Sequence, residues 1–220
     1  SFLLVIHIYF DFISSRCQSL ILFAITIVAG LLLGGVYAIT KNPIAHAQEN
    51  KKQEAFQTVF SDASDFQDLD VNVEDAVAVL QQSGYEKDRI DEVKLAVDGS
   101  GSPLGYVMTV TSTEAYGGEL QIAVGIRMDG TVNRISFLSL SETMGLGMEA
   151  KQPAFYEQFS GKKVDAFAYT KSGATAENEI DALSGATITS NAVTNAVNAG
   201  LCYARNLGLS DAGRGGDGNE

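Results

Sequence analysis

Cysteine and histidine are scarce in this chain of 220 residues, and their scarcity argues against several kinds of site. The two cysteines, Cys17 and Cys202, lie far apart and form no Cys-x-x-Cys pair, which argues against iron–sulfur clusters and cysteine-based zinc sites. The two histidines, His7 and His46, precede the predicted globular part. A Ser–His or Cys–His machinery is therefore not expected, and we predict neither catalytic residues nor a metal site.

Positive charge is also in short supply. The chain has 15 Lys and Arg against 27 Asp and Glu, giving a formal net charge of −12. Because nucleic-acid phosphates are neutralised by Lys and Arg, nucleic acid is not an expected partner. The hydrophobic content of 45% is enough for the core of one modest domain with an appendage.

One long apolar run, residues 20–39, carries no charge. A helix of this length can span a bilayer, so we predict a transmembrane helix here, with membrane lipid as its surroundings. The alternative is a cleaved signal peptide, because Ala45–Ala47 resembles a small-residue cleavage site. We favour a retained anchor, because the run is longer than the usual core of a signal peptide. Within it, Gly30 and Gly34 have a spacing that lets helices pack closely.

The segments on either side of the span are harder to interpret. Residues 1–19 have an uncertain role, as either an interfacial segment or an extension outside the fold. Counting nearby basic residues places the C-terminal side inside the cell, because Arg16 precedes the span and Lys41, Lys51 and Lys52 follow it. Long domains can be translocated regardless of this count.

The part after the span divides into a connector, a domain and a tail. Residues 40–75 are the predicted connector, within which 48–60 form a polar, exposed helix and 61–75 a loop. The domain is predicted over 76–209. The Gly- and Asp-rich residues 210–220 are predicted to be a flexible tail.

Alternating apolar residues predict an antiparallel sheet in the domain. The predicted strands are 90–97, 104–111, 120–126 and 132–140, with turns at 98–101 and at Asp129-Gly130. Consecutive hairpins indicate a half-buried sheet with helices covering one face. A further strand is predicted at 164–169, and helices at 153–159 and from 191 to about 207. The predicted fold class is α+β.

The segment Asp181–Ser190 is the clearest candidate for a binding site, because it combines small residues and hydroxyls before a helix. Thr189 or Ser190 can cap that helix. Small residues let backbone amides approach a ligand closely, and a helix start suits an anion, most obviously a phosphate. The ordinary alternative is a turn and a cap without a ligand. The segment matches neither a P-loop nor a dinucleotide fingerprint.

A second candidate loop, Ser141–Met148, follows the last predicted strand of the sheet. It is either a glycine-rich turn before the next helix or a second wall of a ligand site. In the second case, its backbone amides would supply polar contacts together with Glu142 and Thr143.

Several separated motifs, read together, resemble the RnfG family, the G subunits of the Rnf complex. They are also similar, more distantly, to the C subunit of the sodium-pumping NADH:quinone reductase. The resemblance covers the anchor and residues 48–207, and the pair of loop motifs at this spacing is highly specific. The motifs are Tyr116–Gly118 leading into Val124–Ile126, Asp129-Gly130, Glu142–Gly147 and Asp181–Thr187.

The resemblance implies a covalent flavin. In this family FMN is joined through its phosphate, as a phosphoester, to the threonine that matches Thr187. The positions around the phosphate and ribityl chain correspond to Ser184, Gly185, Ala186 and Thr189, and the loop that contacts the flavin corresponds to Glu142, Thr143, Gly145, Leu146 and Gly147. The family usually has proline where Met144 stands, a change that affects loop stiffness more than contact chemistry. No general base is expected near Thr187, which favours attachment by another protein. The resemblance implies that this protein is a flavin transferase that uses FAD, with Thr187 as the residue it modifies.

The resemblance also implies the wider function and the fold, a single N-terminal transmembrane helix followed by an FMN-binding domain. The chain would carry electrons in a complex that couples transfer between reduced ferredoxin and NAD+ to Na+ or H+ translocation. It would not be catalytic alone, and its partners would be the other Rnf subunits, A, B, C, D and E. The domain would lie on the outer side of the cell membrane, against the count of basic residues, and we follow the family.

Two alternatives remain open at the level of the sequence. One is a membrane-anchored flavin carrier that serves a different extracytoplasmic acceptor. The other is a non-redox binding or sensory domain whose loop holds only a metabolite phosphate, and it predicts no covalent flavin.

Overall fold

The computed structural model describes the backbone of residues 2–69 and 72–209, and their side chains other than those of residues 2–20, 45 and 73. The chain forms two compact units, Ser1–Asn50 and Lys51–Glu220. The predicted flexible tail, 210–220, lies outside the described residues. The side chains that would explain the role of residues 1–19 also lie outside them.

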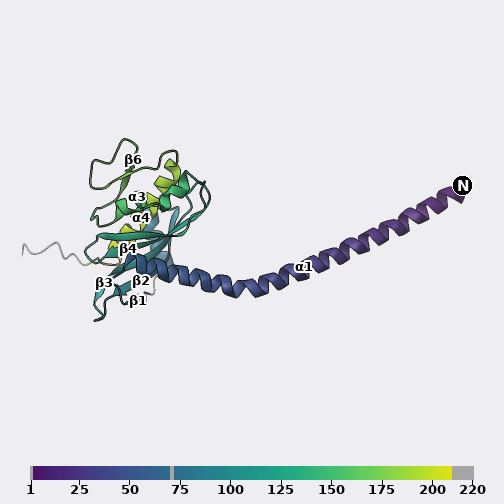
Figure 1. Ribbon diagram of the computed structural model, residues 1–220, viewed down its shortest axis with the longest axis horizontal. Coiled ribbons are helices and arrows are strands. Elements are labelled where there is room, and N and C mark those ends of the chain that lie inside the picture. Colours follow the sequence, from purple (N-terminus) through teal and green to yellow (C-terminus); the bar gives the residue numbers. More distant parts are fainter. Residues whose placement is uncertain (1, 70–71, 210–220) are drawn as a thin grey trace, which may run out of the picture. The chain divides into compact units, whose positions relative to one another are not determined.

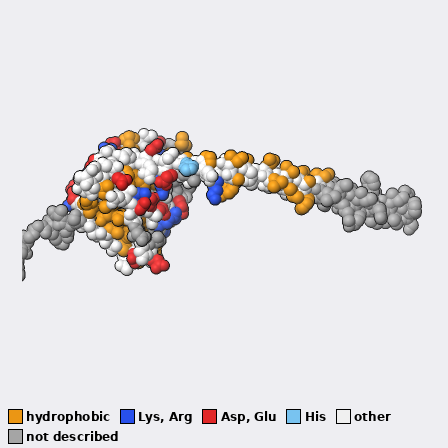
Figure 2. Space-filling model, turned by 90° about the horizontal axis from the view of Figure 1, so that it is seen from below, with side chains coloured by type: hydrophobic (Ala, Val, Ile, Leu, Met, Phe, Trp, Pro, Cys, Tyr) orange, Lys and Arg blue, Asp and Glu red, His pale blue; other side chains and the backbone are white. Residues whose placement is uncertain are grey.

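Helix α1, Phe2–Val59, forms the first unit up to Asn50, and its last turns belong to the second unit (Figure 1). The apolar run predicted from the sequence lies within it, and the described side chains from Ile21 to Ile44 are exposed. Figure 2 shows hydrophobic side chains along this helix. Its apolar part is long enough to cross a membrane, as the sequence predicts.

The second unit is organised around a five-stranded antiparallel sheet with the order β1-β2-β3-β4-β5 (Figure 1). The strands are β1 Asp65–Asp68, β2 Asp88–Val97, β3 Pro103–Ser112, β4 Leu120–Arg127 and β5 Val132–Ser139. The four hairpin-linked strands predicted from the sequence are confirmed. Strand β1 lies where a loop was predicted. The sequence did not indicate this strand, because its four residues are mostly exposed and show no alternation of apolar and polar side chains.

One face of the sheet is covered by α2, Val73–Gln82, and α4, Thr187–Asn206. The apolar side chains of α4 pack against those of β3 and β4 in the larger core of the domain. Gly200 faces this sheet, since a methyl group added there would lie in ordinary van der Waals contact, at 3.7 Å, with atoms of Val110, Val124 and Ile126. This packing fixes the position of the first turn of α4.

The other face is covered by the last turns of α1, so the prediction that helices cover only one face is wrong. Phe56, Val59 and Phe60 are buried there against the sheet, in a smaller core. The sheet accommodates Phe60 through two glycines. A Cβ atom on Gly105 would lie 2.7 Å from the Phe60 ring, and one on Gly125 would lie 3.0 Å from it. The exposed connector predicted at 48–60 is therefore helical but partly buried.

Short elements link β5 to α4: η1 Gly147–Lys151, α3 Pro153–Tyr156, η2 Glu157–Phe159, and the parallel pair β6 Ala168–Thr170 and β7 Glu179–Asp181. The helix predicted at 153–159 is confirmed, with a 3-10 second half, whereas the strand predicted at 164–169 is wrong in extent. Asn198 ties this region to α4, because its side-chain amide exchanges hydrogen bonds of 2.7 and 2.9 Å with the backbone of Phe167.

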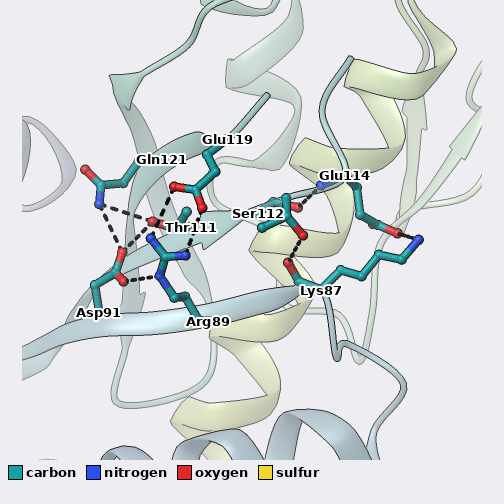
Figure 3. A network of polar contacts seen from close by, with 9 residues as sticks. Lys87, Arg89, Asp91, Thr111, Ser112, Glu114, Glu119 and Gln121 are labelled. Atoms are coloured by element: carbon teal, nitrogen blue, oxygen red, sulfur yellow. Dashed lines mark hydrogen bonds and ion pairs between the residues drawn. The ribbon is translucent and has the colours of Figure 1, made fainter. Parts of the chain in front are cut away.

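A polar network crosses the end of the sheet where the β3–β4 connection begins (Figure 3). Arg89 on β2 contacts Asp91 at 2.8 Å and Glu119 at 3.1 Å. Asp91 also accepts hydrogen bonds from Thr111 on β3 and from Gln121 on β4. The network spans three strands and holds both ends of the loop that carries Tyr116.

Candidate functional site

The two candidate loops lie on opposite sides of one cavity of about 590 Å³. The first loop links β5 to η1, and the second links β7 to α4. A third segment, at Tyr116 in the β3–β4 connection, completes the wall. The lining residues are Tyr116, Glu142, Thr143, Leu146, Gly147, Gly185, Ala186, Thr187, Ile188 and Thr189.

The first loop is held against the β3–β4 connection. One carboxylate oxygen of Glu142, Oε1, accepts a hydrogen bond of 3.0 Å from the backbone N–H of Tyr116. The next residue, Gly117, lies so close that an added Cβ would be 1.6 Å from the carbonyl oxygen of Ser141. Only a residue without a side chain fits there, so the Tyr116-Gly117 backbone fixes the start of the loop.

The same loop closes on itself as a tight turn. The carbonyl oxygen of Thr143 accepts hydrogen bonds of 3.2 Å from the N–H groups of both Leu146 and Met148. Gly145 has φ +73°, a left-handed conformation that glycine adopts without strain. Met144, which replaces the family's usual proline, points to solvent with 81% of its surface exposed. The turn therefore forms without proline.

The side chain of Ser190 holds the second loop in place through two hydrogen bonds. The hydroxyl of Ser190 accepts a hydrogen bond of 2.9 Å from the N–H of Leu183 and donates one of 3.0 Å to the carbonyl of Ala186. The N–H of Ala186 also donates to the carbonyl of Leu183 at 3.1 Å. These bonds bend the chain just before α4 and leave Gly185 at the rim of the cavity.

Helix α4 begins at Thr187, so the prediction that Thr189 or Ser190 caps it is wrong. Its N-cap residue is Ala186, and no described side chain bonds to the cap. The hydroxyl of Ser190 is used inside the turn, and Thr189 is buried. The first-turn amides thus lack a side-chain acceptor at the wall of the cavity, where a helix N-terminus favours negative charge.

The two loops meet where Gly147 packs against Thr189. A Cβ atom on Gly147 would lie 2.6 Å from Oγ1 of Thr189 and 2.8 Å from both Cβ and Oε2 of Glu142. Across the rim, a Cβ on Gly185 would lie 3.0 Å from Leu146. The floor of the cavity is therefore closely packed. Thr187, which precedes the buried Thr189 in the first turn of α4, remains half-buried and lines the cavity.

Asp181, at the start of the candidate segment, does not reach this cavity. Its carboxylate accepts a hydrogen bond of 2.6 Å from the N–H of Ala174, and its own N–H donates to Gln158 at 2.7 Å. Asp181 thus fixes the loop before α4. Among the described residues that line the cavity, the one carboxylate is Glu142, and no histidine is present.

The structure brings most of the predicted site residues together. Ser184 instead lines a neighbouring cavity of about 260 Å³ with Asp181 and Leu183, and Gly145 forms the turn without lining the wall. Tyr116 and Ile188 line the cavity but were not predicted as contacts. The motif Tyr116-Gly117-Gly118 in the sequence was a signal that Tyr116 belongs to the site. Ile188 had no such signal, because its exposure on the first turn of a largely buried helix is known only from the structure.

Two families match the chain in succession. The family described as RnfG N-terminal region matches residues 13–59, and the FMN-binding domain family matches residues 115–201, which include both loops.

Curated relatives match over most of the chain. The chain is 34% identical over 191 residues to the G subunit of the Na(+)-translocating ferredoxin:NAD(+) oxidoreductase complex of Acetobacterium woodii, covering 86% of this chain and 90% of that protein. It is 31% identical over 170 residues to the G subunit of the proton-translocating ferredoxin:NAD(+) oxidoreductase complex of Clostridium ljungdahlii, covering 77% and 80%. Among solved structures, NqrC of Shewanella oneidensis is 21% identical with a TM-score of 0.45, over 54% of this chain and 61% of that one.

Proposed function

This chain belongs to the RnfG family, the G subunits of ion-translocating oxidoreductase complexes, and we propose that it carries electrons there on an FMN joined covalently to Thr187. The observation that carries the proposal is the cavity between the two loops. It combines a half-buried threonine hydroxyl, the uncapped first turn of a 20-residue helix, and apolar side chains at its mouth.

The residues of the cavity fit a flavin phosphate. Its volume of about 590 Å³ lies within the range of about 300–1,000 Å³ typical of cofactor sites. The first-turn amides of α4 suit the phosphate, because their dipoles favour its negative charge. Tyr116, Leu146 and Ile188 are exposed apolar side chains that would cover part of a flat ring system. FMN, when bound, supplies the capacity to accept and release electrons.

Attachment requires a second protein on this proposal. Thr187 has no histidine among the described residues lining its cavity, and the one carboxylate there, Glu142, accepts a hydrogen bond from the backbone N–H of Tyr116. A threonine hydroxyl without a base is a weak nucleophile at neutral pH. We therefore assign the reaction to a flavin transferase that uses FAD. The Thr187 oxygen would bond to the FMN phosphorus, the pyrophosphate bond would break, and AMP would leave with the hydroxyl proton passing to solvent.

The chain's own residues would then position the flavin. Thr187 would hold it at one point, and the packed contact of Gly147 with Thr189 and Glu142 would prevent the two loops from separating. Glu142 would keep Tyr116 at the mouth of the cavity through the backbone hydrogen bond. Covalent attachment would also prevent loss of the cofactor by diffusion.

The membrane arrangement follows the family. We place the domain on the outer side of the cell membrane, with α1 as a single-pass anchor among the other subunits, A, B, C, D and E. A single uncharged span offers no ion pathway, so coupling to Na+ or H+ would depend on those partners. Protease added to intact cells should cut the domain, and a fully protected domain would show that this orientation is wrong.

The function can be tested in everted membrane vesicles from cells producing the assembled complex. With Thr187→Ala, we expect NAD+ reduction by reduced ferredoxin to fall to the background of a strain lacking this chain. Thr189→Ala is the matched control and should keep at least part of the activity. Immunodetection of the other subunits would show that the complex still assembles. Full activity of an assembled Thr187→Ala complex would contradict the proposal.

A further inference from the structure

A second cavity, of about 360 Å³, lies outside the candidate flavin site, along β5. Strand β5 is at the end of the sheet order, so one of its edges has no neighbouring strand along most of its length. The last turns of α1 and the segment from η1 to η2 supply the other walls. The lining residues are Lys51, Thr58, Arg134, Ile135, Ser136, Phe137, Lys151, Tyr156, Glu157 and Ser160.

Positive charge gathers in this cavity on an otherwise acidic chain. Its lining holds three cationic side chains, Lys51, Arg134 and Lys151, against one carboxylate, Glu157. Among the described residues, none of the three cations forms an ion pair within 4 Å. The ammonium group of Lys51 donates to the carbonyl oxygen of Leu138 on β5, which holds it at the edge of the strand. The cations are therefore gathered by the fold and not neutralised by it.

The wall also contains a hydroxyl with an unused donor. The Oγ atom of Ser160 is buried and has no hydrogen-bond partner among the described residues. A buried polar atom of this kind costs free energy unless it is paired. The oxygen has almost no accessible surface, so it would pair with a ligand in the cavity only after the Ser160 side chain rotates towards the space that this residue lines. After that rotation, the hydroxyl would join the ammonium and guanidinium groups in a set of donors. Such a set suits an anion with several acceptor oxygens.

We propose that this cavity binds a phosphate ester. Arginine pairs with phosphate oxygens through two parallel N–H groups, lysine adds a mobile point charge, and the Ser160 hydroxyl adds a neutral donor. The half-buried side chains of Phe137 and Tyr156 provide an apolar wall for the organic part of the ligand. The ester is either the headgroup of an anionic phospholipid or a soluble phosphate ester. Both share the chemistry that the cavity recognises.

The test uses the full chain with its flavin attached, purified in a non-ionic detergent and titrated calorimetrically. The probes are glycerol phosphate, dihexanoyl phosphatidylglycerol, and glycerol as the phosphate-free control. We expect both phosphate probes to bind and glycerol not to bind. Phosphatidylglycerol binding about tenfold tighter than glycerol phosphate identifies a lipid headgroup, and equal affinity identifies a soluble ester.

Variants of the wall assign binding to this cavity. The double variant Arg134→Gln/Lys151→Gln should weaken binding of the phosphate probes by about tenfold or more. Ser160→Ala, a smaller change that removes the unpaired hydroxyl, should weaken binding without lowering the unfolding temperature, and it serves as the test if the double variant does not fold. Lys171→Gln, an exposed lysine outside the cavity, is the matched control and should bind as the unaltered chain does.

The proposal would be overturned by two results. The first is that the unaltered chain binds neither phosphate probe. The second is that the folded double variant and Ser160→Ala both bind as tightly as the control. If the double variant instead loses only its association with other subunits, while phosphate binding is absent throughout, the cavity is a protein contact and not a phosphate site.

Discussion

Glu142 combines a structural contact with a charge beside the cavity. Its Oε1 atom accepts a hydrogen bond from the backbone N–H of Tyr116, and its Oε2 atom lies beside Gly147. Glutamine keeps the oxygen that accepts from Tyr116 but removes the charge, whereas alanine removes both. The two substitutions therefore separate the hydrogen bond from the electrostatic effect.

We predict that Glu142→Gln leaves flavin attachment intact and raises the flavin's reduction potential. A nearby negative charge disfavours the uptake of electrons, and its removal should shift the potential by an amount on the order of tens of millivolts. Glu142→Ala should also alter the flavin absorbance spectrum, because the loop loses its tie to Tyr116. Spectroelectrochemistry measures both, with the exposed Glu149→Ala as the control. An unchanged potential in both Glu142 variants would mean that the residue is only structural.

Asp88 does not line the flavin cavity, and its ionisation should affect the stability of the domain. Burial raises its pKa to about 6, the hydrogen bond from Ser112 opposes this, and the nearby Glu114 adds to the rise. One of its carboxylate oxygens, Oδ1, has no partner among the described residues. Because the folded state holds the proton more tightly than the unfolded state, ionised Asp88 destabilises the fold above pH 6. This penalty disappears as the pH falls from about 6 towards the unfolded pKa of 3.8.

We predict that Asp88→Asn stabilises the domain at pH 7 by a free energy on the order of 1–2 kcal/mol. The gain should shrink as the pH is lowered from 7 to 4.5, since the native carboxyl then becomes protonated. Urea unfolding at several pH values measures it, and Asp65→Asn on the exposed edge strand is the control. A stability difference that does not change with pH would contradict the assignment.

At the scale of elements, the end of α1 is the part that was least expected. Phe60 fits between Gly105 and Gly125, and the Arg127 guanidinium lies 5.7 Å from the centre of its ring. Phe60→Ala should lower the free energy of unfolding by about 3–5 kcal/mol, because it opens a cavity on this face of the sheet. Phe66→Ala, at a half-buried ring on β1, should cost clearly less. Chemical unfolding compares them, and equal losses would show that Phe60 packs less firmly than described.

The helices and strands that could be predicted from the sequence are those with a regular pattern of apolar residues. Strands β2 to β5 alternate and are joined by turns such as Asp129-Gly130, where Gly130 adopts φ +87°, so they were predictable. The buried turns of α1 were not, because their few apolar residues lie within a polar stretch and find their partners only once the sheet exists. The pairing of β6 with β7 involves three residues on each strand, too few for a pattern.

The approximate start of α4 could be predicted from the sequence, but its first residue and its N-cap could not. A helix after small residues was predictable, yet the preference of Ser and Thr for capping positions suggested a later start than Thr187. The fold instead uses the Ser190 hydroxyl to bend the preceding loop and leaves an alanine at the cap. A helix start that departs from the usual capping rule fits a site where a ligand is to take the place of the cap.

At the scale of the whole molecule, both loops of the site could be identified in the sequence, but the residue pattern did not show that they lie on one cavity. Glu142 and Thr187 are separated by α3, the two 3-10 segments and the β6–β7 pair, and only the packing of α4 on the sheet brings them to one cavity. The resemblance to the RnfG family supplied that juxtaposition in advance. Tyr116 and Ile188 were missed because their place at the mouth depends on the same packing.

The most direct test of the central claim is whether flavin remains on the polypeptide at Thr187 after denaturation. The chain would be produced together with a flavin transferase, denatured, and resolved on a gel viewed under ultraviolet light, with the intact mass measured in parallel. The unaltered chain and Thr189→Ala should carry flavin fluorescence and the added mass of the FMN phosphoester. Thr187→Ala should carry neither. Fluorescence and added mass persisting in the Thr187→Ala chain would contradict the account.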